Sequence, residues 1–189
     1  MRDYLLKVAS GASVLAQREL LKKALAHHLA ERHDGERSRY LFSEEPRHPV
    51  ESDWVRIRCV ADGLAMPSGI AMPGPDVIAP AVGRRVVLRA WVALSSEESR
   101  GDRIHVARSR FEHHLERLAQ PLADVAWQEV ADEKSVSIAR GRVVFGRRCA
   151  RLQVSGCVSD PEALSSLLRN GIGDAKSYGF GLVDVEPIQ

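Results

Sequence analysis

Cysteine and long apolar runs are scarce in this 189-residue chain. Its cysteines, Cys59, Cys149 and Cys157, are odd in number and show no C-x-x-C spacing, which predicts free thiols in a reducing compartment. No apolar run is long enough to span a membrane, and the first residues lack the apolar stretch of a signal peptide. We therefore predict a cytoplasmic protein with no membrane partner.

An excess of one charge and the common metal-binding motifs are lacking too. The chain has 27 Lys and Arg against 25 Asp and Glu, so its net charge of +2 does not by itself indicate a nucleic-acid-binding protein. The histidines form no H-x-x-x-H or H-E-x-x-H array with carboxylates, and no metal site is predicted. A hydrophobic content of 44% with 28% charged residues is ordinary for a globular protein of one domain or two small ones.

The first half of the sequence predicts the order β-α-β-β-loop-β. Ser13 is the predicted N-cap of a helix over residues 14–31, in which leucines at helical spacing form one apolar stripe. Residues 61–83 contain several prolines that break any long helix, so they are predicted as a loop with at most one helical turn. The strands are predicted at residues 4–8, 39–43, 54–60 and 84–94.

The second half predicts the order β-α-β-β-α-β. A polar and charged stretch, residues 95–101, is the predicted linker. One helix is predicted over residues 109–118, and another begins at the capping sequence Ser159-Asp160-Pro161-Glu162 and ends at Asn170-Gly171. The strands are predicted at residues 104–106, 125–130, 136–138 and 143–158, with a last one after the second helix.

These two patterns predict an α+β fold with two ferredoxin-like βαββαβ domains in tandem. The expected boundaries are residues 1–94 for the N-terminal domain and 95–189 for the C-terminal domain. The second helix of the first domain is reduced, because prolines occupy its place. No sequence repeat relates the two halves, so the duplication is inferred from the order of elements.

The most informative stretch runs from Gly171 to Val185 and reads G-I-G-D-A-K-S-Y-G-F-G-L-V-D-V. Gly171 and Gly173 allow positive φ angles and let backbone N–H groups approach an anion. Lys176 adds a mobile cation at the same place. We therefore predict a loop that contacts phosphate groups.

Neither common nucleotide motif fits this glycine loop. A P-loop requires G-x-x-x-x-G-K-[ST], but the residue before Lys176 is Ala175. A dinucleotide fingerprint requires G-x-G-x-x-G, and Lys176 occupies the position of its last glycine. Both motifs also lead from a strand into a helix, whereas this loop leads from a helix into a strand. No nucleotide cofactor is predicted.

A basic run precedes the glycine loop. Residues 134–159 contain no acidic residue, and a solvated protein face is the ordinary explanation of such a run. Its position directly before a phosphate-type loop instead favours a surface that follows an RNA backbone. The cations of this run are Lys134, Arg140, Arg142, Arg147, Arg148 and Arg151. Arg100, in the linker, and Arg103, two residues after it, are weaker candidates for the same surface.

The order helix, G-I-G-x-A-K-S-x-G-x-G-L, strand resembles the signature of the CRISPR-associated repeat-RNA endoribonucleases. Within that group the sequence is most similar to the CasE type, the RNA-processing subunit of Cascade complexes and a member of the RAMP superfamily. The resemblance is specific over residues 159–187. It extends more weakly to the first predicted helix and to short segments at 39–42, 88–90 and 111–118.

This resemblance implies a RAMP fold, which is RRM-like, and a metal-independent endoribonuclease that cuts CRISPR repeat RNA at a stem-loop. The products would be a 2′,3′-cyclic phosphate and a 5′-OH, and the protein would retain the mature crRNA hairpin beside other subunits of an effector complex. No cofactor is implied. The implied RNA-binding residues of the loop are Gly171, Gly173, Lys176 and Ser177.

In the resembled family a histidine on the first helix takes part in cleavage. Its place falls on Lys22 in this sequence, which is a departure from the family pattern. Three possibilities stay open: Lys22 or Lys23 acts, His27 acts from one turn away beside Lys23, or cleavage is lost. A lysine acts as a base only if burial or neighbouring cations lower its pKa, and otherwise stabilises charge.

Other histidines are weaker candidates. His28 falls within the leucine stripe of the first predicted helix and is expected to be buried, while His113 and His114 are expected at the surface and the edge of the core. Two other functions also stay open. One is a non-catalytic crRNA-binding subunit with the same fold, which Lys22 favours. The other is a metabolic enzyme that binds a phosphorylated small molecule in the glycine loop, which the missing nucleotide and metal motifs disfavour.

Overall fold

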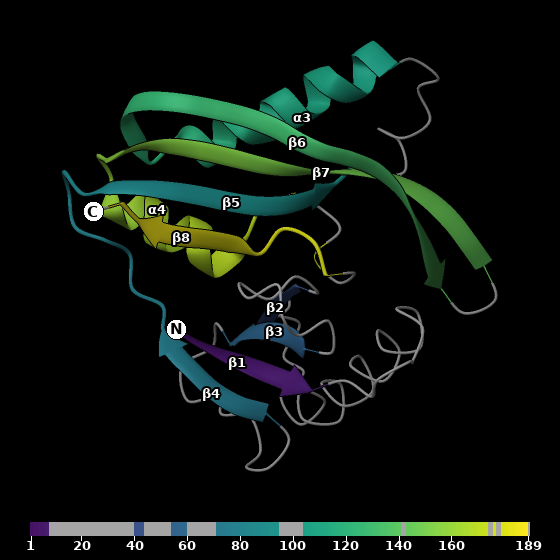
Figure 1. The fold of residues 1–189 in the computed structure, drawn as a ribbon, viewed down its shortest axis with the longest axis horizontal. Coiled ribbons are helices and arrows are strands. Elements are labelled where there is room, and N and C mark those ends of the chain that lie inside the picture. Colours follow the sequence, from purple (N-terminus) through teal and green to yellow (C-terminus); the bar gives the residue numbers. More distant parts are fainter. Residues whose placement is uncertain are drawn as a thin grey trace.

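In the part of the chain that the structure describes, two antiparallel sheets of four strands each make up the framework (Figure 1). The structure is a computed structural model, and it describes residues 1–7, 40–43, 54–59, 71–94, 104–140, 143–173, 176 and 179–188. Helices α3 (Ile104–Ala119) and α4 (Pro161–Asn170) accompany the sheets. No helix in these ranges is long and apolar enough to cross a membrane.

The N-terminal sheet has the strand order β2-β3-β1-β4. Its inner strands are β1 (Arg2–Lys7) and β3 (Trp54–Cys59), which pair antiparallel with Arg2 opposite Cys59. Strand β2 (Tyr40–Ser43) pairs with β3. The sequence predicted these three strands to within two residues at each end, and the structure confirms them. The predicted helix over residues 14–31 lies outside the described residues.

The outer strand β4 (Ala71–Asp76) corrects the prediction of a loop at 61–83. It reads A-M-P-G-P-D and pairs antiparallel with β1 along one side. Prolines are tolerated there because an edge strand leaves one row of N–H positions without a ladder partner. Gly74 faces β1 so closely that a Cβ on it would lie 2.9 Å from the Asp3 carbonyl oxygen.

The C-terminal sheet has the order β6-β7-β5-β8 and contains a strand that the sequence pattern places in the other half. Strand β5 (Arg85–Ala93) was predicted to close the N-terminal domain, but it pairs with β7 (Val143–Val158) and with β8 (Val183–Pro187). A boundary between residues 94 and 95 would separate β5 from its hydrogen-bonding partners. The connection between the two sheets instead runs through residues 77–84 (Figure 1).

Helix α3 begins earlier than predicted. Residues 104–106 were predicted as a strand, but they form the first turn of α3. With β5 as the first strand, the second half of the chain has the element order β5-α3-β6-β7-α4-β8. Strand β6 (Leu122–Arg140) joins the two short strands predicted at 125–130 and 136–138 into one.

Strands β6 and β7 form a long hairpin that continues past the end of β5 (Figure 1). Two irregularities interrupt its pairing, between Ala123 and Trp127 and between Ala131 and Lys134. Each contains an aspartate with positive φ, Asp124 at 47° and Asp132 at 50°. Aspartate is among the few side chains that adopt this conformation readily, and such bulges bend and twist a strand.

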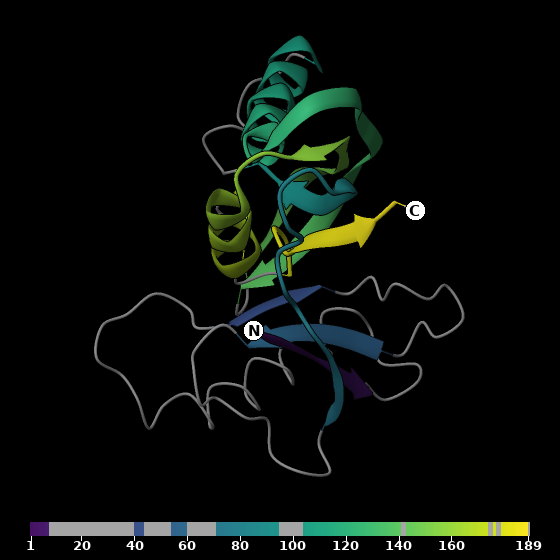
Figure 2. The ribbon, with the colours of Figure 1, turned by 90° about the vertical axis from the view of Figure 1, so that its left-hand side faces the viewer.

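The core of the C-terminal half lies between its sheet and both helices. Leucine and phenylalanine side chains of α3 and α4 pack on alternate residues of β5 and β7, and Figure 2 shows the two helices on the same side of the sheet. The α4 residues Leu164 and Leu168 are fully buried, as their helical spacing predicts. This packing fixes the two segments that flank the glycine loop, α4 and β8.

Candidate functional site

The glycine loop connects α4 to β8 and begins at a helix cap. Asp160 accepts a hydrogen bond from Ala163 N–H at 2.8 Å, and Pro161 is the first helical residue. At the other end Gly171 donates its N–H to the Leu167 carbonyl at 2.8 Å. The proline at the first helical position and the glycine after the last turn confirm the sequence prediction, because they suit groups that helix ends leave unpaired. The predicted capping sequence is corrected in one respect: the N-cap is Asp160, while the Ser159 hydroxyl donates to the Pro121 carbonyl at 3.1 Å.

The two ends of the loop cross each other at Gly171 and Gly181. Ile172 N–H donates to the Gly181 carbonyl at 2.9 Å, and Gly181 N–H donates to the Trp91 carbonyl of β5 at 2.6 Å. A Cβ on Gly171 would lie 2.5 Å from the Gly181 oxygen. Both glycines have positive φ, 65° and 81°, as the sequence predicted for Gly171. Only glycine fits this crossing of two backbones.

The same contacts correct one detail of the predicted phosphate loop. The N–H groups of Gly171, Ile172 and Gly181 donate to backbone carbonyls, and Gly179 N–H donates to the Lys176 carbonyl at 3.2 Å. The Gly171 amide was expected to face an anion, but it completes the end of α4. The amides at the crossing therefore already have backbone partners and are not available to an anion.

Gly173 lies above the side of α3 that faces the core. A Cβ on Gly173 would lie 3.2 Å from Val92 Cγ1 and 3.9 Å from His114 Cε1. His114 is 5% exposed, whereas its neighbour His113 is exposed. The prediction of a surface position and a core-edge position for this pair is correct, and His114 lies next to the start of the loop. Lys176 is half-buried.

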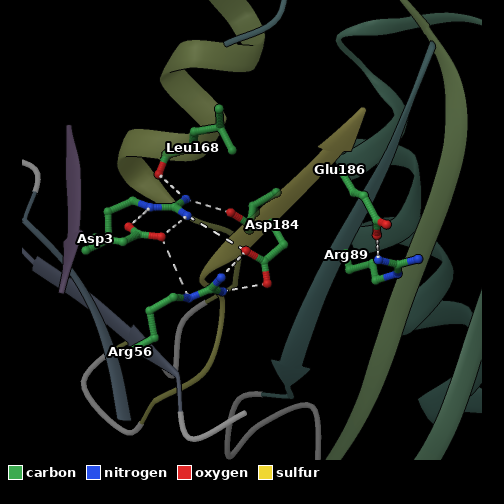
Figure 3. A network of polar contacts seen from close by, with 8 residues as sticks. Asp3, Arg56, Arg89, Leu168, Asp184 and Glu186 are labelled. Atoms are coloured by element: carbon green, nitrogen blue, oxygen red, sulfur yellow. Dashed lines mark hydrogen bonds and ion pairs between the residues drawn. The ribbon is translucent and has the colours of Figure 1, made fainter. Parts of the chain in front are cut away.

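A buried arginine joins the base of the glycine loop to the N-terminal sheet. Arg58 of β3 is completely buried and donates from Nη1 to the carbonyls of Leu168, at 3.3 Å, and Val183, at 2.6 Å. Its Nε and Nη2 donate to the two carboxylate oxygens of Asp3, at 2.8 and 3.1 Å. Asp3 and Leu168, which accept these hydrogen bonds, are labelled in Figure 3.

A second arginine of the same strand makes a parallel contact. Arg56 Nη2 donates to Asp184 Oδ2 at 2.5 Å, and its Nη1 lies 2.5 Å from Asp184 Oδ1 (Figure 3). Its Nε is 3.8 Å from Asp3 Oδ2, which is an ion-pair distance and too long for a hydrogen bond. The two arginines and two aspartates form a network, defined here as the Arg56–Arg58 network, between the sheets.

Several cations of the basic run have partners within the protein. Arg151 Nη2 lies 2.5 Å from Asp132 Oδ2, and Arg148 Nη1 lies 3.4 Å from Glu133 Oε1. Both acids are in β6, just outside the acid-free stretch, in the irregularity between Ala131 and Lys134 that interrupts the pairing with β7. Arg147 donates to the Leu94 carbonyl at 2.8 Å, and Lys134 Nζ lies 4.0 Å from the ring centroid of Trp91. The first two contacts are thus within the hairpin, and the other two join the hairpin to β5 and to Leu94, which follows β5.

The other predicted site residues are not placed by the structure. Arg140 is the last residue of β6, and only its backbone is described. No group of three or more His, Cys, Asp or Glu side chains able to hold a metal ion occurs among the residues that are placed. The predicted residues that fall outside the described ranges are Lys22, Lys23, His27, Arg100, Arg103, Arg142 and Ser177.

Sequence reasoning missed the Arg56–Arg58 network. The only signal was the alternation of Arg56 and Arg58 on β3, which is the ordinary pattern of a solvated strand face. Charged side chains are rarely buried unless paired, and their partners, Asp3 and Asp184, are 55 and 128 residues from Arg58 and Arg56 respectively. No local pattern links residues so far apart.

The chain is similar to solved structures over nearly its whole length. It matches a CRISPR endoribonuclease Cse3 bound to 19 nt RNA at 20% identity and a TM-score of 0.64, covering 99% of this chain and 100% of that one. A Thermus thermophilus Cse3 bound to an RNA representing a pre-cleavage complex matches at 21% identity and a TM-score of 0.64, with the same coverage. Cas6e from Escherichia coli K-12 matches at 17% identity and a TM-score of 0.63, covering 100% of both chains.

At these identities the structures establish a shared fold. No curated protein sequence matches the chain. The profile of the CRISPR-associated protein family, described as CRISPR associated protein, matches residues 21–187. This match spans the glycine loop, the basic run and the two arginines of the Arg56–Arg58 network, and it agrees with the CasE-type resemblance of the loop sequence. The chain therefore belongs to the CRISPR-associated protein family.

Proposed function

We propose that this protein is an endoribonuclease that cleaves CRISPR repeat RNA at a stem-loop and keeps the mature crRNA. The observation that supports this most is the glycine loop, a helix-to-strand turn with Lys176 inside it and no nucleotide motif, in a chain of this family. The similar structures include Cse3 bound to RNA, and the likeness extends over nearly the whole of this chain. RNA is therefore the proposed ligand of the loop.

We also propose that the architecture is a tandem of two ferredoxin-like units of the RAMP kind. Each sheet, numbered from its own first strand, has the order 2-3-1-4 with antiparallel neighbours. In the second unit the elements follow the order β-α-β-β-α-β. In this arrangement the units are residues 1–76 and 85–189, since β5 belongs with the second sheet.

The proposed reaction needs no metal ion to balance. A base takes the proton of the 2′-OH, and the oxygen forms a bond to the adjacent phosphorus. The bond from phosphorus to the 5′-oxygen then breaks, and an acid returns a proton to that oxygen. A cation near the phosphate stabilises the charge that develops on it. The products are a 2′,3′-cyclic phosphate and a 5′-OH.

The proposed catalytic groups are Lys22, Lys23 and His27, and Lys176 of the loop would hold the phosphate backbone. Arg140, the last residue of β6, and Arg142, two positions later in the sequence, are proposed to extend this surface. The other partners proposed are further subunits of a CRISPR effector complex, in the cytoplasm, because one similar structure is a CRISPR RNA-guided surveillance complex.

A second candidate is a non-catalytic crRNA-binding subunit with the same fold. The observation that favours it is Lys22 at the position where the family has a histidine. A lysine of ordinary pKa, about 10.4, is protonated at neutral pH and cannot accept a proton. Binding without cleavage would distinguish this candidate from the enzyme.

The test is an assay with a labelled repeat hairpin and a hairpin of unrelated sequence, each with and without a chelator. We expect the protein to bind and cut only the repeat hairpin, at the same rate with the chelator present. Binding without a cut would favour the non-catalytic subunit. Thermal stabilisation by micromolar ATP or NAD without RNA binding would contradict both and favour the metabolic enzyme.

A further inference from the structure

We propose that Arg58, with Arg56, is a positioning residue that fixes the glycine loop relative to the N-terminal sheet. That the two arginines fix the position of the loop is inferred from the geometry alone. That this position affects the cleavage rate rests on the proposed function. No role in RNA contact is assigned to either arginine, since Arg58 is completely buried and Arg56 is 4% exposed.

Arg58 contacts the loop at both of its ends. Leu168, whose carbonyl accepts one hydrogen bond, lies in the last turn of α4, three residues before Gly171. Val183, whose carbonyl accepts the other, is the first residue of β8 and directly follows the loop. One guanidinium group thus joins the entry and the exit of the loop, and Asp3 holds that group on β1.

The chemistry of these contacts requires arginine. The carbonyl of Leu168 belongs to a helix C-terminus, where unpaired carbonyls have a partial negative charge that favours a cation. The Asp3 carboxylate is buried as well, and the bidentate pair with Nε and Nη2 compensates its charge. An ammonium group is a single point and cannot span two carbonyls and a carboxylate in this geometry.

Arg56 of β3 joins the N-terminal sheet to β8, the strand that follows the loop. Its partner Asp184 is the second residue of β8, and both oxygens of that carboxylate are within 2.5 Å of Arg56 nitrogens. The Asp184 side chain is 23% exposed, so this pair is less shielded than the pair of Arg58 and Asp3. The pair is accessible to a mild variant, Asp184→Asn, which keeps the shape and removes the charge.

Such positioning matters for cleavage because the loop proposed to hold the RNA and the proposed catalytic groups come from different halves of the chain. The loop follows α4 in the C-terminal half, whereas the proposed catalytic groups Lys22, Lys23 and His27 belong to the chain between β1 and β2. RNA held by the loop must meet those groups at a fixed distance. A displacement of about 1 Å is enough to reduce a rate by about 100-fold.

The test uses the full-length protein with Arg58→Lys and Asp184→Asn, and Arg89→Met as the matched control. Arg89 pairs with Glu186 across β5 and β8, but this pair is exposed and does not involve the N-terminal sheet. Amide hydrogen exchange is followed at Ile172 and Gly181 of the loop and at Val158, which donates to the Arg84 carbonyl away from it.

We expect exchange at Ile172 and Gly181 to increase at least tenfold in both network variants and not at Val158, and the control to resemble the wild type. Equal increases at all three amides would show general destabilisation and overturn the proposal. Unchanged exchange at the loop in Asp184→Asn and Arg58→Lys would overturn it too. Should Arg58→Lys not fold, Asp184→Asn alone decides between these outcomes.

Single-turnover cleavage at saturating protein provides the functional readout. The cleavage rate constant should fall about 10- to 100-fold in the network variants, while the RNA Kd changes less than threefold. A rate constant that stays unchanged would contradict the link to cleavage. If the wild type does not cut repeat RNA, the proposed function fails, and the exchange pattern still decides whether the network positions the loop.

Discussion

Gly181 and Ile172 lie so close that a Cβ on Gly181 would be 2.0 Å from the Ile172 carbonyl oxygen. The entry and the exit of the loop are therefore in direct backbone contact. Ile172 N–H donates to the Gly181 carbonyl, and Gly181 N–H donates to the Trp91 carbonyl of β5. This crossing holds the segment with Lys176 between α4 and β8. A side chain at the crossing must displace one of the two ends.

The first prediction concerns this crossing. Gly181→Ala places a methyl group against backbone and forces a positive φ on alanine. The φ strain alone should lower the unfolding free energy by about 1–3 kcal/mol, and the steric overlap should lower it further. Gly146→Ala is the control, because a Cβ there meets nothing within 4 Å, and a change within about 1 kcal/mol is expected. Urea unfolding measures both. Equal stability of the two variants would mean that the ends of the loop do not cross this closely.

The second prediction separates cations that are proposed to contact RNA from cations that stabilise the hairpin. Replacing Arg140 and Arg142 by alanine should reduce the slope of log K against log salt concentration by about one unit for each phosphate that the variant no longer neutralises. Arg151→Ala should change that slope less, because its partner is Asp132 at 2.5 Å. Filter binding of repeat RNA between about 50 and 200 mM salt would measure the slopes, since phosphate neutralisation has a large effect on affinity in this range. A larger change of slope in Arg151→Ala than in the Arg140 and Arg142 variant would instead assign the RNA contact to Arg151.

The third prediction distinguishes the proposed catalytic groups. A histidine of ordinary pKa, about 6.5, titrates where a general base is useful, so His27→Ala should lose about 10²–10⁴-fold in cleavage rate with little change in RNA affinity. If Lys22 only stabilises charge, Lys22→Ala should lower the rate and leave the acidic limb of the pH–rate profile in place. Single-turnover rates from about pH 5 to 9 test both, because this range brackets the ordinary histidine pKa. Full-speed cleavage by a Lys22, Lys23 and His27 triple alanine variant would place the active site elsewhere.

The fourth prediction concerns pH and the edge of the N-terminal sheet. Arg2 Nε donates to Asp76 Oδ1 at 2.8 Å, and this hydrogen bond holds the pKa of Asp76 below its ordinary value. A carboxyl group with a lowered pKa stabilises the folded state above its unfolded pKa, and the contribution disappears as the pH falls through the folded pKa. Asp76→Asn should therefore be slightly less stable than the wild type at about pH 7 and equal to it in acid. A stability difference that persists below about pH 2 would contradict this linkage.

The parts of the fold that sequence reasoning found are those specified by local chemistry. The caps of α4 follow from Asp160, Pro161 and Gly171, which supply groups that a helix end lacks. The part that it missed, β4, has prolines that are unfavourable within a sheet and acceptable at its edge. Whether a segment becomes an edge is decided by the other strands, and its own residues do not reveal it.

The partners of charged residues were equally hidden. The acid-free run begins directly after Glu133, yet the hairpin brings Glu133 to Arg148 and Asp132 to Arg151. Strand β5 likewise has the apolar composition of an ordinary β-strand, and only its pairing with β7 and β8 assigns it to the second sheet. Long-range register is a property of the folded chain, and one sequence contains no direct record of it.

The most direct measurement of the central claim compares two repeat hairpins that differ by one oxygen atom. One is all ribose, and the other has a 2′-deoxy sugar at the nucleotide before the cut. Both should bind with Kd values within about twofold, because the proposed binding surface would contact phosphates. Only the ribose hairpin should be cut, giving a 2′,3′-cyclic phosphate and a 5′-OH. Cleavage of both hairpins at the same rate would contradict attack by the 2′-OH, and tight binding with no cut in either would leave the protein an RNA-binding subunit.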